Sequence, residues 1–142
     1  MMDIQFDVIE EAKKIFNTEM EALARTRDSI GADFEEMIEL ILNCKGKLVL
    51  TGMGKPGHIA TKMAATFASL GTPSFFMHPG EAMHGDLGMV EEKDIVILMS
   101  YSGESEEVTR LMPVLQEIRC TTVAITGNPK STLAKECQHH IF

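Results

Sequence analysis

Three serines within six residues form the segment best suited to binding a phosphate group. Ser100, Ser102 and Ser105 surround Gly103, and the segment lies between a strongly apolar run and a helical pattern. Serine hydroxyls and the free amides at a helix start can hold a phosphate without a net positive charge. One serine is enough to cap a helix, so three of them favour phosphate binding over capping alone.

A second segment, residues 52–57, reads GMGKPG and has the spacing GxGxxG. Such glycines let the backbone approach a ligand, so Gly54 and Lys55 are candidate substrate-binding residues, although a simple strand-to-helix turn would use the same glycines. A dinucleotide site would need an acidic residue about 20 positions further on. The sequence there reads MHP, and Pro56 lacks a backbone donor, so we do not expect a nucleotide cofactor.

A third segment, residues 78–88, is dense in ionisable side chains: His78, Glu81, His84 and Asp86 lie within nine residues. Histidine titrates near neutral pH and suits proton transfer, which makes this segment a candidate for acid–base chemistry. The same side chains are potential metal ligands. Their spacing matches no standard site, so we expect no functional metal.

Glu106 and Glu107 begin the helical pattern that follows the serine segment. Carboxylates at a helix start usually lie on a solvated face and complement the helix dipole. Glu107 comes two residues after Ser105 and could therefore reach over the strand end where the phosphate would lie.

Short β-rich runs alternate with helical patterns from residue 47 onward. We predict strands over 47–51, 74–77, 95–99 and 121–125, and helices over 57–70, 81–87, 105–119 and 131–138. The strand runs are continuously apolar, which is typical of parallel strands covered on both faces. The alternation predicts a doubly wound α/β fold of Rossmann or flavodoxin type, with three αβα layers. Ligands in such folds bind at the carboxyl ends of the strands, which is where these segments lie.

Helical spacing dominates the residues before this alternation. Apolar side chains recur at helical intervals over 9–23 and again over 34–42. A chain of 142 residues predicts one domain, with N-terminal helices over 1–46 and the parallel sheet over 47–142. The last residues, 139–142, look like the start of a fifth strand, so we expect the domain to be truncated there.

Composition narrows the class of protein. The chain is 44% hydrophobic and 24% charged, which is ordinary for a soluble globular protein. Its net charge of −8 disfavours nucleic-acid binding. The acidic N-terminus lacks the pattern of a signal peptide, and we find no run suited to spanning a membrane. Three cysteines without CxxC spacing indicate a reducing, cytoplasmic location.

Taken together, these segments resemble a known family, the SIS (sugar isomerase) domain, and most closely the sugar-isomerase half of bacterial D-arabinose 5-phosphate isomerases. The resemblance covers residues 47–129. It is densest in residues 52–58, 62–69, 71–76 and 78–90, and the last of these ranges reads HPGEAMHGDLGMV. The motifs SYSGES and ITGNP complete it. It implies an SIS-type fold and the interconversion of D-ribulose 5-phosphate and D-arabinose 5-phosphate. That reaction feeds synthesis of the sugar Kdo for bacterial lipopolysaccharide or capsule.

The resemblance also implies roles for particular residues. The serines of SYSGES would hold the phosphate, and Lys55, His84 and Glu107 match positions of the family's active site. We also expect Gly54, Lys55, His78 and Gly103 among the substrate-binding residues. The resemblance implies a homotetramer that needs no cofactor. Pro56 and Tyr101 depart from the family pattern, which has a serine and an asparagine or glutamine there. The chain also ends before a later segment that supplies further active-site residues in the family.

An aldose–ketose isomerase moves a proton between neighbouring carbons through an enediol. The reaction needs a base, an acid and stabilisation of the oxygens, but no metal or organic cofactor. His84 and Glu107 are the candidates for proton transfer, and Lys55 could stabilise negative charge. The alternative function is a non-catalytic sugar-phosphate sensor. Regulators of that kind carry a helix-turn-helix domain, and the residues before Lys47 are too few and too acidic to form one.

Overall fold

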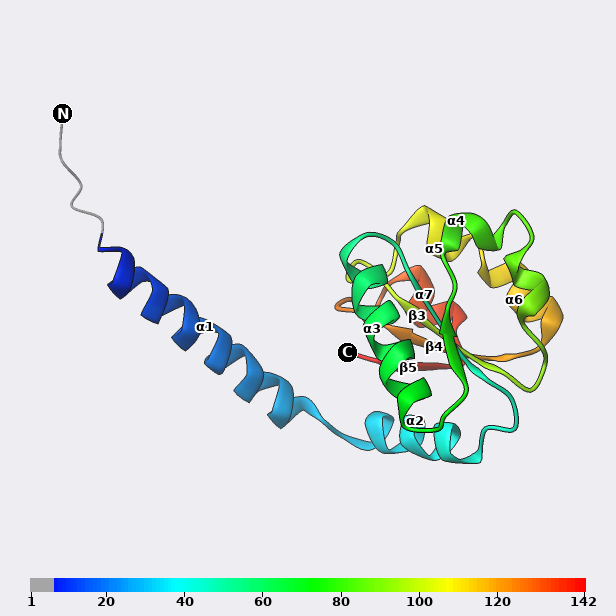
Figure 1. Cartoon of the computed structure of the whole chain (residues 1–142), viewed down its shortest axis with the longest axis horizontal. Coiled ribbons are helices and arrows are strands. Elements are labelled where there is room, and N and C mark those ends of the chain that lie inside the picture. The colour runs from blue at the N-terminus through cyan, green and yellow to red at the C-terminus, as the bar shows by residue number, and fades with distance from the viewer. Residues whose placement is uncertain (1–6) are drawn as a thin grey trace. The chain divides into compact units, whose positions relative to one another are not determined.

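The computed structural model describes residues 7–142, which divide into two compact units (Figure 1). The acidic start of the chain, residues 1–6, lies outside the described residues. The first unit ends at Ala32 and contains helix α1, Val8–Ser29. The Asp7 side chain caps α1 by accepting hydrogen bonds from the amides of Ile9 and Glu10, both at 3.0 Å. No residue of α1 is buried, so its predicted apolar face is exposed.

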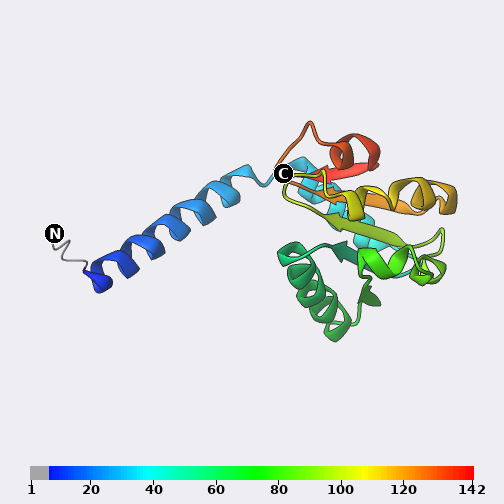
Figure 2. The same ribbon diagram turned by 90° about the horizontal axis from the view of Figure 1, so that it is seen from above.

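The second unit, Asp33–Phe142, is built on a five-stranded parallel sheet. The strands are β1 Leu48–Gly52, β2 Ser74–Phe76, β3 Ile95–Met99, β4 Thr121–Ile125 and β5 His139–Ile141. Their order, β2-β1-β3-β4-β5, is that of flavodoxin-like folds. Figure 2 shows α3 in green at one side of the sheet and β5 in red at the other. The four predicted strands and the doubly wound fold are confirmed, and residues 139–141 form the fifth strand.

Helices cover both faces of the sheet, as continuously apolar strands require. Helices α2 (Ala32–Asn43) and α3 (Lys55–Ser69) pack on one face. The other face carries α4 (Pro79–Ala82), the 3-10 helix η1 (Asp86–Met89), α5 (Glu106–Thr109), α6 (Met112–Ile118) and α7 (Thr132–Glu136). Within residues 7–142, no helix combines the length and the apolar character needed to cross a membrane.

Two predicted helices are in fact interrupted, and in both cases a single residue explains the break. The prediction of one helix over 105–119 is wrong because Pro113 has no N–H to donate to the carbonyl of Thr109, so α5 and α6 are separate. The predicted helix over 81–87 divides into α4 and η1 at Gly85, whose φ of 135° is open to glycine but not to a continuing helix.

A buried carboxylate ties together the beginnings of β1 and β3. Asp94 is 1% exposed and accepts hydrogen bonds from the amides of Lys47 at 2.7 Å and Glu91 at 2.8 Å. The Lys47 ammonium lies 3.2 Å from the same carboxylate. Burial alone raises the pKa of Asp94, but these hydrogen bonds and the ammonium outweigh it and hold the pKa below its ordinary value. Asp94 therefore fixes the amino edge of the sheet as a charged acceptor.

Candidate functional site

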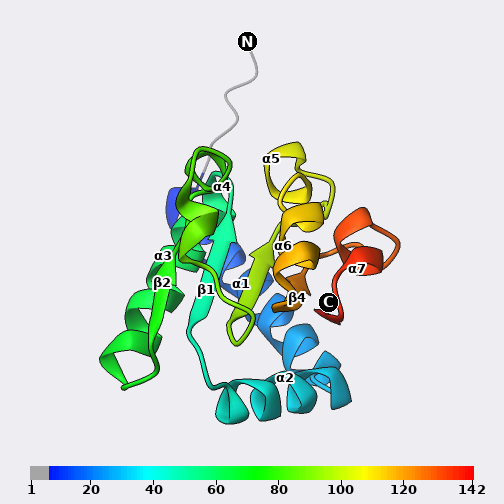
Figure 3. The ribbon, with the colours of Figure 1, turned by 90° about the vertical axis from the view of Figure 1, so that its right-hand side faces the viewer.

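The loops that follow β1 and β3 lie side by side at the carboxyl edge of the sheet. Strands β1 and β3 are neighbours in the sheet. After β1 the chain continues to β2 on one side, and after β3 it continues to β4 on the other side. A sheet of this kind binds ligands at such a reversal of strand order. Figure 3 shows α4 and α5 beyond the same end of the strands, with α2 beyond the opposite end. The fold therefore gathers the three candidate segments at one edge.

The three serines form one cluster of hydroxyl groups. The Oγ atom of Ser100 lies 2.9 Å from that of Ser105 and 3.5 Å from that of Ser102. Ser100 Oγ also accepts a hydrogen bond from the amide of Gly103 at 3.1 Å. Ser100 is 2% exposed, whereas Ser102 is open to solvent. The cluster thus has an anchored end and an end that an anion can reach.

Helix capping does not account for these hydroxyls. Ser105 occupies the position before α5, but its side chain makes no capping hydrogen bond and points to Ser100 instead. Ser102 Oγ accepts from the amide of Glu104 at 3.1 Å, which shapes the loop and not the helix. Gly103 has φ 67°, which lets the chain turn back between the serines. The geometry therefore does not show simple capping of α5 by Ser105, and ligand binding by the three serines stays a prediction.

The glycine segment is explained mainly by close packing of α3 on β1. A side chain at Gly57 would place its Cβ 2.5 Å from the carbonyl oxygen of Gly52, so only glycine lets the helix approach the strand this closely. Gly54 has φ 65° and directly precedes α3. Pro56 lies in the first turn of α3, where an N–H has no helical partner in any case. Lys55, the first residue of α3, is exposed.

A cavity of about 320 Å³ lies beside the glycine segment, between α3 and the end of β2. His58, Thr61, Phe76 and His78 contribute to its wall. His78 Nδ1 accepts a hydrogen bond from the amide of Gly80 at 3.1 Å, which leaves Nε2 as the ring nitrogen available to a ligand. Sequence reasoning did not single out His58 or Thr61. Their spacing of one helical turn on α3, just after the glycines, is the signal that could have found them.

The candidates for proton transfer are at the same edge but are not brought into contact. Lys55 follows β1, His84 follows α4, and Glu107 lies in α5. Helix α4 packs beside α5, so the His84 segment is near the helix that carries Glu107. All three side chains are exposed, and across residues 7–142 no hydrogen bond or ion pair joins any two of them. The described residues also contain no group of three potential metal ligands.

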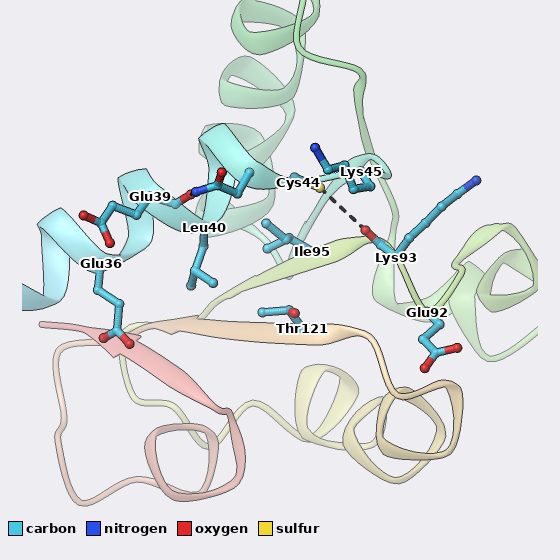
Figure 4. A pocket seen from close by; sticks show the side chains of 10 residues that line it. Glu36, Glu39, Leu40, Cys44, Lys45, Glu92, Lys93, Ile95 and Thr121 are labelled. Carbon is cyan, nitrogen blue, oxygen red and sulfur yellow. Dashed lines mark hydrogen bonds between the residues drawn. The ribbon is translucent and has the colours of Figure 1, made fainter.

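A larger cavity, of about 500 Å³, lies at the opposite edge of the sheet (Figure 4). Helix α2 and the first residues of β3 and β4 line it, including Glu39, Leu40 and Thr121. Cys44 closes one side, with its thiol 3.6 Å from the carbonyl oxygen of Lys93. Parallel α/β sheets place their ligand sites at the carboxyl edge, so the size of this cavity does not make it the functional site.

Known proteins share both the sequence and the fold of this chain. The arabinose 5-phosphate isomerase KdsD of Escherichia coli K12 is 51% identical over 136 residues, which is 96% of this chain and 42% of that relative. The chain therefore spans less than half the length of that curated relative. A solved structure of an E. coli CFT073 protein in complex with arabinose 5-phosphate superposes with a TM-score of 0.91 at 43% identity, covering 95% of this chain and 72% of the other.

A more distant structure shows how widely the fold occurs. The sugar isomerase domain of an RpiR transcription factor from Sphaerobacter thermophilus has a TM-score of 0.80 at 20% identity, covering 91% of this chain and 73% of the other, which shows a common fold alone. The family model for the SIS domain matches residues 41–142, including every strand and the serine cluster. On that match, the chain belongs to the SIS domain family.

Proposed function

We propose that this chain is the sugar-phosphate-binding and isomerising part of an enzyme that interconverts D-ribulose 5-phosphate and D-arabinose 5-phosphate. The observation that carries the proposal is the cluster of three serine hydroxyls at the reversal point of the sheet. Two comparisons support it: a relative at 51% identity is named as that isomerase, and a structure at 43% identity was solved with arabinose 5-phosphate.

In this proposal the phosphate binds through local geometry, because the chain as a whole is acidic. The hydroxyls of Ser100, Ser102 and Ser105 can each rotate a proton toward a phosphate oxygen. Gly103 keeps the loop tight enough for all three to converge. At the same carboxyl edge of the sheet, Gly54 and Lys55 follow β1 and bind the sugar, and Lys55 adds the positive charge that the serine loop lacks.

The isomerisation itself is a pair of proton transfers. Starting from the aldose, a base removes the proton from carbon 2, and the enediol that forms is reprotonated at carbon 1. A second group moves a proton from the oxygen on carbon 2 to the oxygen on carbon 1. We assign these transfers to His84 and Glu107, with Lys55 stabilising the negative charge that develops on oxygen. His78 completes the substrate-binding set from the adjoining cavity, and the reaction balances without a metal or organic cofactor.

The proposal extends to assembly and location. The exposed apolar face of α1 supports self-association of the whole protein, which we propose is a homotetramer. The three cysteines are free, and burial raises the pKa of Cys120 to about 11 and that of Cys137 to about 12, so both remain thiols. Free thiols support a cytoplasmic location, where the product would enter Kdo synthesis.

A second candidate function, binding of a sugar phosphate without turnover, is favoured by one observation. Among the described residues no hydrogen bond or ion pair joins Lys55, His84 and Glu107, which are all exposed, whereas Ser100 and Ser105 hydrogen-bond to each other. Such a chain would sense arabinose 5-phosphate and would not convert it.

Proton exchange distinguishes the two functions directly. The 142-residue chain is incubated with ribulose 5-phosphate in D₂O without added cofactor, and NMR follows both arabinose 5-phosphate and deuterium at carbon 1. An isomerase removes a proton from carbon 1 to form the enediol and incorporates deuterium when that carbon is reprotonated from the solvent, even where net conversion is slow. Binding without deuterium incorporation would favour the sensor, and absence of binding would contradict both candidates. Ribulose, which lacks the phosphate, is the matched control substrate.

A further inference from the structure

Glu104, which lies inside the serine segment, joins that segment to the start of α7. Its Oε1 atom accepts a hydrogen bond from the amide of Thr132 at 2.8 Å. Its Oε2 atom accepts a second one from the Thr132 hydroxyl at 2.7 Å. Both carboxylate oxygens are therefore engaged by one residue, which follows Glu104 by 28 positions in the sequence.

Two further contacts hold the same pair of segments together. The amide of Leu133 donates a hydrogen bond to the carbonyl of Gly103 at 3.2 Å. Ser131 is fully buried, and its hydroxyl caps α7 by accepting from the amide of Ala134 at 3.3 Å. A Cβ at Gly103 would lie 2.1 Å from that hydroxyl oxygen, so no space separates the loop from α7. The turn between Ser102 and Ser105 is thus fixed from one side by the start of α7.

A carboxylate is an unexpected choice for this position if the loop binds phosphate. Like charges repel, so a negative side chain two residues from Ser102 opposes a phosphate dianion. The two bonds to Thr132 explain its presence, because both partners are donors and a carboxylate accepts from both. These bonds also lower the pKa of Glu104, which keeps it ionised as an acceptor. Glu106, two residues later, pairs instead with Arg110 on the exposed side of the helix.

We propose that Glu104 is a positioning residue for phosphate binding: by holding Thr132, it fixes the serine loop against α7 and keeps the hydroxyls converged before the ligand arrives. This inference rests on the proposed function of the serine loop. A loop that is ordered in advance binds more tightly because less conformational freedom is lost when the ligand binds.

Four variants of the chain test the role of Glu104, with the dissociation constant for arabinose 5-phosphate measured by calorimetry. Glu104→Ala removes both bonds, and we expect the constant to rise about tenfold. Glu104→Gln keeps both, since its amide accepts from the Thr132 amide and donates to the Thr132 hydroxyl, so we expect a change within about twofold. Thr132→Val removes one bond and should give an intermediate loss. Glu106→Gln, the matched control, should bind as the unmodified chain does.

Hydrogen exchange of the Thr132 amide, which donates to Glu104 Oε1, reports the Glu104–Thr132 contact itself when it is measured without ligand. We expect faster exchange in Glu104→Ala and unchanged exchange in Glu104→Gln, because only the first loses the contact. If Glu104 only stabilised the fold, the folded alanine and glutamine variants would bind arabinose 5-phosphate with equal affinity. Where Glu104→Ala does not fold, Thr132→Val and Glu104→Gln give the same comparison.

The outcomes separate this inference from the proposed function. If the unmodified chain binds arabinose 5-phosphate and Glu104→Ala binds equally well, the positioning role is overturned while the proposed function stands. If the alanine and glutamine variants weaken binding equally, charge and not the bridge is responsible, and the role is again overturned. If the unmodified chain binds arabinose 5-phosphate no better than arabinose, the proposed function fails and the positioning role fails with it.

Discussion

Ser102 differs from its two neighbours in how little the fold depends on it. Ser100 is buried and Ser105 is half-buried, and they hydrogen-bond to each other, whereas Ser102 is exposed. Its hydroxyl oxygen accepts from the amide of Glu104, and its proton is free to turn toward a ligand. Among the three serines, Ser102 is therefore the one whose removal tests binding with the least effect on stability.

We expect Ser102→Ala to weaken binding of arabinose 5-phosphate by about 10- to 100-fold, since a hydrogen bond to a charged group contributes about 1.5–3 kcal/mol. The free energy of unfolding should change by less than about 0.5 kcal/mol, because the side chain is exposed. Calorimetry and urea denaturation on the same protein give both values. Ser69→Ala, at the end of α3, is the control. Lost stability with unchanged affinity would mean that Ser102 only shapes the loop.

At the scale of elements, the approach of α3 to β1 depends on Gly57. Because a Cβ there would lie 2.5 Å from the Gly52 carbonyl oxygen, Gly57→Ala should push the helix off the strand. We expect the free energy of unfolding to fall by about 1–3 kcal/mol, as in other overpacked cores. Gly88→Ala is the matched control, since no atom lies within 4 Å of its added Cβ. Equal urea midpoints for the two variants would show that α3 and β1 can separate without cost.

The bond network of Asp94 predicts a pH dependence of stability at the other edge of the sheet. Its pKa is lowered in the folded state, so its stabilisation is present above the unfolded-state pKa of about 3.9 and is lost as the pH falls through the folded-state pKa. We expect Asp94→Asn to lower the free energy of unfolding by about 2 kcal/mol near pH 7. The side-chain amide of asparagine has one accepting oxygen and one donating nitrogen, so it cannot accept from the amides of both Lys47 and Glu91 as the two carboxylate oxygens do.

Urea denaturation at a series of pH values checks this prediction for Asp94. The difference between Asp94→Asn and the unmodified chain should shrink as the pH falls below the unfolded-state pKa of about 3.9 and through the lowered folded-state pKa. Glu92→Gln, on the same loop but exposed, should follow the unmodified chain at every pH. A difference that stays constant with pH would assign the stabilisation to packing and not to charge.

Local signals explain which elements the sequence could predict. The strands follow from continuous apolar runs, and the candidate site from the rule that loops after parallel strands share an edge. The residue types of Gly85 and Pro113 could have predicted the two breaks. The apolar spacing continues through both positions, however, and therefore indicated uninterrupted helices. The bridge from Glu104 to Thr132 was not accessible in this way, because it depends on two loops that meet only once β3 and β4 pair.

At the scale of the whole molecule, the exposed face of α1 predicts association between chains. Phe16, 68% exposed, lies on the apolar face with Met20 and Leu23. We expect Phe16→Asp to reduce the association state measured by sedimentation, because it places a charge on the apolar face that association would bury. Thr18→Asp, which adds the same charge on the opposite face of the helix, should leave association unchanged. Equal sedimentation of the two variants would show that the apolar face of α1 does not take part in association.

The sheet order described above also decides when the serine loop can take its shape. Each neighbouring pair of strands in residues 33–142 is joined through a crossover that contains at least one helix. Such pairings close long loops before their contacts form, which makes parallel sheets slow to fold. Since Glu104 and Gly103 hydrogen-bond to residues of α7, these contacts form only after the ribosome has released the chain through that helix. The serine loop, although it follows β3 directly, therefore gains its contacts with α7 only after β4 and α7 have been made.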